Sequence, residues 1–383
     1  MVEKWANSCD PGDIQDAVDY VEGEGGGTTY LPVHTGIWYD EKVVLTPPPN
    51  NKSDIIGSGY LASILKQTKP APFNEMFYVD GSNGKQTRIS GIQFKGYVTS
   101  SSDDVSGCAI ELDKAIDFRI DHCKFLDFPS KAIYVCNVWT GTTRGVIDHN
   151  IIDNPYKDIY GGGMWAYGIV IIGQAYTWDA DITHFLGKYE TAPLGFPIVY
   201  IEDNIISRCR HAISSTQGAW YVARHNTIDE ARPKNFGSID VHGDAGSGAP
   251  GGRGLEAYNN NITGSAGYGA AQAFWIRGGG GVIYDNNMDN ISYGISLYRG
   301  TVEEGLIRTL YIWDNICDGT FLNNDGGYVE NTDYFLREPS QAQDGFAYTP
   351  YPYPHPLTTG QPYHLLSVNS NPSNIPFTIR RII

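Results

Sequence analysis

Apolar positions recur along this chain in two short patterns. One is an apolar strand that ends at an Asn or its equivalent, as in VIDHN and YIEDN, and the other is a strand of the form small–Ile–x–apolar, as in KAIYV and YGISL. The Asn-type strands align on Cys123, Asn150, Asn204, Asn226, Asn260, Asn286 and Asn315. The steps between them are 22 to 34 residues, except for one of 54 that contains an aromatic insertion over about 173–197. Two strands per period, with Gly- and Asn-rich turns and no helices between them, predict a solenoid of β coils. The recurring Asn predicts a ladder of turn residues that bond the backbone of the neighbouring coil.

Both ends of the chain depart from the repeat. Residues 13–22 place Ile14, Ala17, Val18 and Val21 at the spacing of one helix face, which predicts a cap over the open N-terminal end of the core. The coils occupy 88–322, and the Pro- and Tyr-rich residues 323–383 are expected to form an extended tail packed on the solenoid. We therefore predict one all-β domain over 1–383, with residues 1–60 forming the cap and the first coils.

Charge and hydropathy exclude several classes of partner. The chain carries 27 Lys and Arg against 43 Asp and Glu, a formal net charge of −16, and has no long basic stripe for nucleic acid. No run of 18 apolar residues is present, so we expect no insertion into a membrane. Polar sequence follows Met1 at once, which predicts either a mature chain or one exported by another route.

The six cysteines are widely spaced and contain no C-x-x-C motif. This spacing argues against zinc and favours buried free thiols. If the protein is extracellular, a disulfide among Cys108, Cys123 and Cys136 is an alternative.

The alternation of strand residues predicts which side chains point outward. In the Asn-type strands the last outward row is Asp121, Asp148, Glu202, Arg224, Tyr258, Tyr284 and Trp313, preceded by a row that includes Glu256. In the other strands the outward pairs include Ser214/Thr216, Asp240/His242, Trp275/Arg277 and Ser296/Tyr298.

One segment of this acidic chain is locally basic. Between Arg208 and Arg253 it holds six Lys and Arg against four Asp and Glu, and three of the nine histidines. We expect His211, Arg224, His225, Asp240, His242, Arg253, Glu256 and Tyr258 to form one cluster over two or three coils. Such an island indicates a site for an anionic ligand, the alternative being a solvated basic loop. For His242 itself, in the sequence DVHG before a Gly-rich loop, the alternative is a structural turn residue.

An outward aromatic series extends beyond this segment. Aromatic faces stack on sugar rings, so we expect Trp275, Tyr284, Tyr298 and Trp313 to contact substrate together with Arg277. Stacking of aromatic rings between successive coils is the alternative.

Several stretches resemble the pectate-lyase-like superfamily of right-handed parallel β-helices. They are DIQDAVDYVEGEGGGTTYLP near the N-terminus, the repeated xIxDNxI, and YTPYPYPHPL at 348–357. The resemblance covers nearly the whole chain and implies that fold, with a secreted, monomeric protein acting on polysaccharide. It does not choose an activity, because the superfamily includes lyases, hydrolases, epimerases, tailspikes and adhesins. Its lyases acting on alginate and dermatan carry an HG after a strand like that of His242, but their catalytic Lys and Arg fall near Thr216 and Val241 here.

The same resemblance bears on calcium. Pectate lyases pair an acidic Ca²⁺ cluster with a neighbouring Arg, and Asp148 and Glu202 beside Arg224 are similar. Hard cations prefer several carboxylate oxygens, so these two residues are our expected metal ligands. The alternative is an ordinary charged face in which Arg224 pairs with Glu202.

These residues favour β-elimination from an anionic, uronate-containing polysaccharide. Elimination requires neutralisation of the sugar carboxylate, a base for the α-proton and an acid for the leaving oxygen. We expect Arg224, with Arg253 or Ca²⁺, in the first role and His242 as base, oriented by Asp240. Tyr258 or His211 is the expected acid.

Two other functions remain open from the sequence. A glycoside hydrolase would use Asp240, Asp244 and Glu256 as carboxylates about 5–9.5 Å apart. A non-catalytic carbohydrate-binding or adhesive β-helix would use the aromatic residues and need no perturbed titratable group.

Overall fold

The computed structural model describes most of the chain. The described residues are 1–39, 41–49, 51–68, 75–82, 86–97, 107–136, 143–154, 165–173, 186–189, 198–231, 237–243, 251–264, 271–299 and 306–359. Asp244, one of the expected hydrolase carboxylates, lies outside them.

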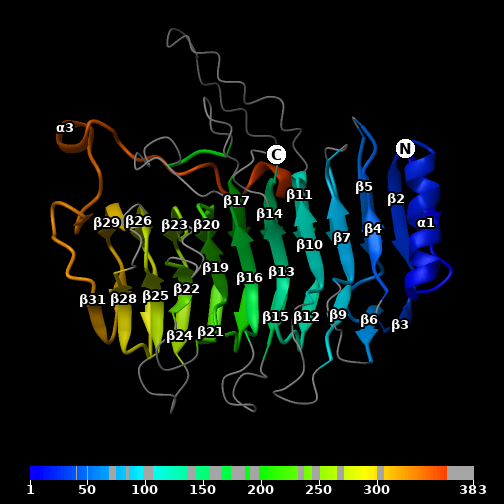
Figure 1. Ribbon diagram of the computed structural model, residues 1–383, viewed down its shortest axis with the longest axis horizontal. Helices are drawn as coiled ribbons and strands as arrows, with labels where there is room; N and C mark the ends of the chain where they lie inside the picture. The colour runs from blue at the N-terminus through cyan, green and yellow to red at the C-terminus, as the bar shows by residue number, and fades with distance from the viewer. Residues whose placement is uncertain are drawn as a thin grey trace, which may run out of the picture.

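The described strands form three parallel sheets that run the length of the molecule (Figure 1). Sheet A has twelve strands in the order β1(Val2–Trp5), β2(Gly27–Leu31), β5(Ser53–Gly57), β8(Arg88–Ser90), β11(Ile116–Asp121), β14(Arg144–Asp148), β17(Val199–Glu202), β20(Trp220–Arg224), β23(Gly254–Tyr258), β26(Gly279–Tyr284), β29(Ile307–Trp313) and β32(Tyr334–Phe335). Sheet B has β3(His34–Trp38), β6(Ser63–Gln67), β9(Gln93–Lys95), β12(Lys124–Leu126), β15(Ile151–Asp153), β18(Ile205–Ser207), β21(Thr227–Ala231), β24(Asn261–Gly264), β27(Asn287–Asp289) and β30(Ile316–Cys317). Sheet C has β4(Val43–Leu45), β7(Phe77–Asp80), β10(Ile110–Asp113), β13(Lys131–Cys136), β16(Tyr167–Ile172), β19(Ile213–Thr216), β22(Gly237–Val241), β25(Gln272–Ile276), β28(Tyr293–Leu297) and β31(Thr320–Asn324). Neighbouring strands of a sheet come from successive coils, so the fold is the predicted parallel β-helix.

Each coil contains three strands, which corrects the prediction of two. The stretch RIDHCKF was expected to be one strand, but it is divided between β11 in sheet A and β12 in sheet B. His122 lies between them with φ 53, a left-handed backbone that turns the chain from one sheet to the next. The inward parity changes at this corner, from Phe118 and Ile120 before it to Cys123 and Phe125 after it, and this change was the signal of a third strand that the sequence contained.

The predicted outward rows are confirmed by the register of the sheets. In sheet A, Asp121 pairs with Asp148, Asp148 with Glu202 and Glu202 with Arg224. In sheet C, Ser214 pairs with Asp240, and Asp240 with Trp275.

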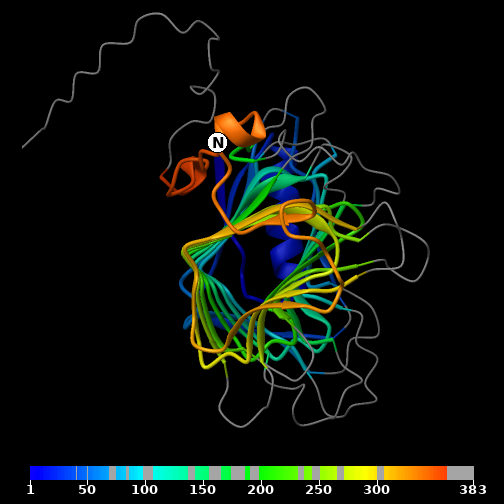
Figure 2. The same cartoon turned by 90° about the vertical axis from the view of Figure 1, so that its left-hand side faces the viewer.

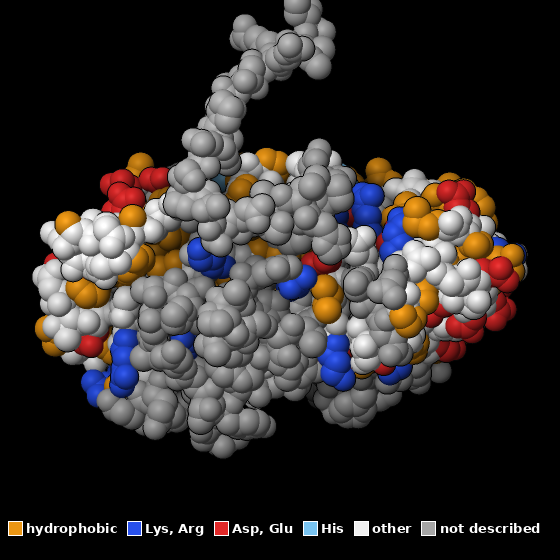
Figure 3. All heavy atoms as spheres, turned by 90° about the horizontal axis from the view of Figure 1, so that it is seen from above, with side chains coloured by type: hydrophobic (Ala, Val, Ile, Leu, Met, Phe, Trp, Pro, Cys, Tyr) orange, Lys and Arg blue, Asp and Glu red, His pale blue; other side chains and the backbone are white. Residues whose placement is uncertain are grey.

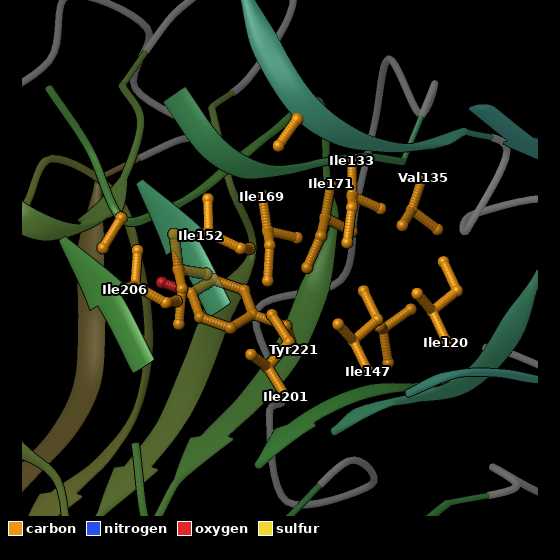
Figure 4. Packing of buried hydrophobic residues seen from close by; sticks show 14 of the residues in the cluster. Ile120, Ile133, Val135, Ile147, Ile152, Ile169, Ile171, Ile201, Ile206 and Tyr221 are labelled. Carbon is orange, nitrogen blue, oxygen red and sulfur yellow. The ribbon is translucent and has the colours of Figure 1, made fainter. Parts of the chain in front are cut away.

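The three sheets enclose an interior that runs along the molecule (Figure 2). The inward side chains fill it as one continuous apolar core (Figure 4). Ile147 and Ile201 from sheet A, Ile169 from sheet C and Ile152 and Ile206 from sheet B point toward one another in its centre. All five are fully buried, and burial of such a side chain stabilises the fold by about 1.5–3 kcal/mol. Successive coils thus stack apolar residues on one another in the interior.

The recurring Asn side chains form the predicted ladder at the corner between sheets A and B. Asn150 Oδ1 accepts a hydrogen bond from the Cys123 amide (2.9 Å), and Asn204 Oδ1 accepts one from the Asn150 amide (3.0 Å). The same bond repeats up to Asn315, which accepts from the amide of Asn286 at 3.1 Å. Because the side chains from Asn150 to Asn286 are buried, each satisfies backbone donors and acceptors that water does not reach.

The N-terminal end of the solenoid is covered as the sequence suggested, whereas the expected tail over 323–383 is described only as far as residue 359. Helix α1(Pro11–Gly23) buries Ile14, Ala17, Val18 and Val21 against the first coil, and acidic side chains gather at this end of the surface (Figure 3). Beyond β32, the chain passes through the short helix α3(Gln341–Asp344) and then returns along sheet A to the 3₁₀ helix η4(Pro356–Thr358), which contacts β11 and β14 (Figure 1).

The described helices and the cysteine thiols bear on the expectations about membrane insertion and disulfides. Within the described residues, no helix has the length and apolar character needed to cross a membrane. All six cysteines are free, so the alternative of a disulfide among Cys108, Cys123 and Cys136 is wrong.

Candidate active site

Arg224 lies on the outward face of sheet A but is completely buried. Its Nε donates to Glu202 Oε2 at 2.7 Å and its Nη1 donates to Tyr258 Oη at 2.9 Å. Nη1 and Nη2 also donate to the carbonyl oxygens of Tyr351 and Pro352, at 2.7 and 2.9 Å. The C-terminal segment 346–359 therefore occupies the place where a sugar carboxylate was expected. Because these contacts occupy its guanidinium, the predicted role of Arg224 in neutralising the substrate carboxylate is wrong.

The expected calcium ligands are instead partners of arginines. Asp148 accepts two hydrogen bonds from Arg119, at 2.9 and 2.8 Å, while Glu202 is held by Arg224 and by the His355 amide at 2.8 Å. Among the described residues no group of three or more His, Cys, Asp or Glu is placed to hold a metal ion. The donor set around Asp148 and Glu202 does not fit Ca²⁺, which requires more oxygens than two carboxylates that already neutralise guanidinium groups.

Glu256 and Tyr258 are also enclosed by the C-terminal segment. Glu256 accepts hydrogen bonds from Tyr348 Oη at 2.7 Å and from the Gly187 amide at 2.9 Å. Burial raises the pKa of Glu256 to about 7 and the pKa of Tyr258 to about 12. Neither side chain faces a surface on which a polysaccharide could lie, which removes Tyr258 as the acid and Glu256 as a hydrolase carboxylate.

The remaining sheet A residues have structural contacts. The rings of Tyr258, Tyr284 and Trp313 stack on one another, with centroids 4.8 and 4.4 Å apart, so stacking between coils explains this part of the aromatic series. His225 stacks on Tyr353 at 3.6 Å. Arg253 is buried just before β23. The expected contacts of His225, Arg253, Glu256, Tyr284 and Trp313 with substrate are not supported by these positions.

The other half of the expected cluster lies on the outward face of sheet C. Asp240 is fully buried and accepts hydrogen bonds from Arg277, with Nη2 at 2.7 Å from Oδ2 and Nε at 3.1 Å from Oδ1. Ser214 Oγ donates to Asp240 Oδ2 at 3.1 Å. Burial acts to raise the pKa of Asp240, but the positive charge of Arg277 and its hydrogen bonds oppose this, and the pKa lies below its ordinary value. Asp240 is therefore an anion that orients its neighbours, rather than an acid catalyst.

His211 lies behind this ion pair. Its Nδ1 is 2.5 Å from the Gly237 carbonyl oxygen, and its Nε2 is 4.0 Å from Asp240. A carbonyl only accepts, so Nδ1 carries the proton. Burial lowers the pKa of His211 to about 4, so the ring is neutral near pH 7 and does not act as the expected acid.

His242 is held in a defined tautomer. Its Nδ1 donates to the Gly243 carbonyl at 3.0 Å, which leaves Nε2 as the unprotonated nitrogen of the neutral ring. Burial lowers the pKa of His242 below its ordinary value, although Asp240 opposes this shift. A neutral imidazole with a partly exposed face is suited to accept a proton.

His242, Arg277 and Tyr298 occupy successive coils at one outward position, which we call the sheet C row. The ladder continues past the strand ends, because the Arg277 amide donates to Val241 and the Tyr298 amide donates to Ile276. Neighbouring members therefore stand about 4.8 Å apart at the backbone. Arg277 stacks on the Trp275 ring, 4.0 Å from its centroid, and Tyr298 is 49% exposed beside the same ring.

The expected cluster thus combined residues from two faces of the solenoid. Arg224, Tyr258 and Glu256 are on sheet A, whereas His211, Asp240 and His242 are on sheet C. Arg277 and Tyr298 were expected only to bind substrate. Each lies three residues after an inward position, Phe274 or Ile295, as His242 lies three after Ile239, and this equal offset was the signal that placed them in one row.

Comparisons with known proteins support no family assignment. No family model matches the chain, and no curated protein matches it. Solved structures similar to it include an alginate lyase from a Paenibacillus species, with 14% identity, a TM-score of 0.48 and coverage of 84% of this chain and 98% of that one. Another is the A-module of a mannuronan C-5 epimerase from Azotobacter vinelandii, at 11% identity and a TM-score of 0.40, covering 88% and 98%. The catalytic domain of a GH87 α-1,3-glucanase in complex with nigerose has 13% identity and a TM-score of 0.40, covering 89% of this chain and 68% of that one. Likeness at this level does not assign an activity, and the fold assignment rests on the three sheets of the chain itself.

Proposed function

We propose that this protein is an extracellular, monomeric polysaccharide lyase that cleaves a uronate-containing, anionic polysaccharide by β-elimination. The observation that carries the proposal is the sheet C row, in which a neutral histidine, an arginine and a partly exposed tyrosine follow one another on adjacent coils. These are the three chemical functions that elimination requires.

Arg277 is the group we assign to the sugar carboxylate. Its bonds to Asp240 use Nε and Nη2, and its plane lies on the Trp275 ring. Nη1 is then the part of the guanidinium that can bind a carboxylate from the ligand. Neutralisation of that carboxylate makes the α-proton of the uronate more acidic and stabilises the negative charge that develops as it leaves.

His242 and Tyr298 flank Arg277 and supply the two proton transfers. His242 Nε2 takes the α-proton at C5, the electron pair of that C–H bond becomes the C4=C5 double bond, and the C4–O bond breaks. Tyr298 gives its phenolic proton to the departing oxygen. The products are an unsaturated uronate and a chain with a new hydroxyl end, and both residues recover their protonation states through solvent.

A non-catalytic carbohydrate-binding module is the second candidate. The exposed Tyr298 and the ring of Trp275 would suit stacking on sugars without any reaction. The hydrolase alternative is less well supported, because Asp240 is paired with Arg277 and Glu256 lies on the other sheet.

The test is to incubate the protein with a panel of uronate polymers, with and without Ca²⁺ or EDTA. We expect ultraviolet absorbance from the conjugated product to rise, and EDTA to leave the rate unchanged because Asp148 and Glu202 do not form a calcium site. New reducing ends without that absorbance would instead indicate a hydrolase. Glycan binding without either product would indicate the binding module.

A further inference from the structure

A repeated Asp-His pair lies outside the sheet C row. The tripeptide Ile-Asp-His occurs at 120–122 and again at 147–149, in consecutive coils. Asp121 pairs with Asp148 in sheet A, so His122 and His149 follow side by side at the corner with φ of 53 and 55. Their rings are stacked, with centroids 5.2 Å apart and planes at 6°.

Each imidazole is oriented by a buried carboxylate. His122 Nδ1 is 2.7 Å from Asp121 Oδ2, and His149 Nδ1 is 2.9 Å from Asp148 Oδ2. Both carboxylates have no exposed surface and are each bound twice by an arginine, Asp121 by Arg88 and Asp148 by Arg119. They are therefore anionic acceptors that hold a proton on Nδ1.

This arrangement presents two unprotonated nitrogens to solvent. With Nδ1 donating, the neutral ring has its lone pair on Nε2. The side chains of His122 and His149 are 56% and 47% exposed. A carboxylate that accepts from one ring nitrogen is the usual support of a histidine whose other nitrogen ligates a metal.

We propose that His122 and His149 form a binding site for a divalent transition-metal ion such as Zn²⁺, Ni²⁺ or Cu²⁺. Imidazole suits these ions and not Ca²⁺. Metal–nitrogen bonds of about 2.0–2.1 Å require the two Nε2 atoms to lie within about 4 Å of each other. The exposed rings must therefore tilt toward one another when the ion binds, and the other coordination positions are taken by water or an external ligand.

The neighbouring coils define where the site ends. Asp203 and His225 continue the same corner row, with φ of 58 and 57. Both are engaged by Tyr353, whose hydroxyl donates to Asp203 Oδ1 at 2.7 Å and whose ring stacks on His225. Metal binding by His122 and His149 is independent of the proposed lyase function.

The experiment is calorimetric titration of the whole chain with Zn²⁺ and with Ni²⁺, above the ordinary histidine pKa of about 6.5. We expect one ion per chain at this site, and at least a tenfold loss of affinity in His122→Ala and in His149→Ala. His225→Ala is the matched control, since it removes a histidine from the same row and should leave the affinity unchanged. Added Ca²⁺ should not compete.

A second readout does not depend on heats of binding. The ion should raise the unfolding temperature of the wild type and of His225→Ala, but not of the two site variants, because a ligand stabilises only the state that binds it. The proposal is overturned if the wild type binds no ion, if both site variants bind as the wild type does, or if His225→Ala weakens binding as much as they do.

Discussion

At the scale of single residues, His242 has the most specific expected role. Its neutral ring and fixed tautomer make it the proposed base, so His242→Ala should lower kcat by about 10²–10⁴-fold with little change in KM. In the wild type, kcat/KM should rise with pH through an apparent pKa below the ordinary histidine value of about 6.5, because burial lowers the pKa of His242. Activity then rises with pH as this group loses its proton. An unchanged rate or an unchanged acid limb in His242→Ala would contradict the assignment.

The role of the Arg277 guanidinium geometry can be separated from the role of its positive charge. Arg277→Lys keeps the charge but cannot make the paired bonds to Asp240 or the planar stack on Trp275. We expect kcat/KM to fall by about 10²–10³-fold, as when one donor to a developing anion is removed. Steady-state kinetics on a uronate polymer measures this, with Arg337→Lys as a control far from the sheet C row. Full activity in Arg277→Lys would show that charge alone is sufficient or that Arg277 is not at the site.

At the residue scale, the sequence predicted which side chains point away from the core. Alternation placed Asp240, His242, Trp275 and Arg277 outward correctly, because one residue in two faces the core of every strand. It could not show that Arg224 is covered. The contacts that bury Arg224 come from Tyr351 and Pro352, more than a hundred residues further along the chain.

At the scale of elements, the Asn ladder joins the coils. Asn226 is fully buried, donates to the Ile201 carbonyl at 2.9 Å and accepts from the Asn204 amide at 3.1 Å. Asn226→Ala leaves several buried groups without partners, each costing about 1–3 kcal/mol, so we expect a loss of at least about 3 kcal/mol in the free energy of unfolding. Urea denaturation measures this loss.

The end of the ladder provides the control for Asn226→Ala. Asn315 makes comparable bonds but is half-buried, so water can replace them in Asn315→Ala. Its loss should be clearly smaller. Equal losses would mean that burial of the ladder does not determine its contribution.

The third strand of each coil is what the sequence missed at this scale. Strands such as β15 and β18 have only three residues, too few for alternation to distinguish them from the continuation of the preceding strand. From β11 onward, the left-handed residue at the corner between sheets A and B is not a glycine but His122, His149, Asp203, His225, Asn259, Asp285 or Asp314 in successive coils. A turn signal based on glycine therefore fails here, although Asn and Asp also enter this conformation.

Arg224 has a role in stability at the scale of elements. It joins sheet A to the C-terminal segment, and Arg224→Met leaves Glu202 as a buried charge without its partner. We expect a loss of about 3–5 kcal/mol in the free energy of unfolding. The double variant Arg224→Met/Glu202→Gln should recover part of it, since glutamine can still accept from the His355 amide. Lyase activity of the folded Arg224→Met protein should be retained, and its loss would return Arg224 to the catalytic site.

At the scale of the whole molecule, the outward faces of sheets A and C differ in their exposure. Between β11 and β29, sheet A is covered by residues 346–359, whose aromatic side chains pack with Tyr200, Tyr258 and Tyr284 in a second apolar cluster. Sheet C carries the partly exposed His242, Arg277 and Tyr298. An outward side chain on a solenoid is consequently available to a ligand only if no distant segment returns over it. The repeat predicted from sequence defines the coils but does not say which face the tail will cover.

The attachment of the tail to sheet A should depend on pH through Glu256. Burial raises the pKa of Glu256 from 4.5 to about 7, so the folded protein holds its proton more strongly than the unfolded chain does. The stability from this group is fully present below about pH 4.5 and is lost as the pH rises through about 7, by up to about 3 kcal/mol. Glu256→Gln stays neutral at every pH and keeps an acceptor for the Gly187 amide. Urea denaturation on either side of this window should therefore show a steeper fall in the wild type than in Glu256→Gln, with the variant the more stable above pH 7. Parallel pH dependence in the two proteins would mean that Glu256 is ionised beneath the tail, balanced by Arg224.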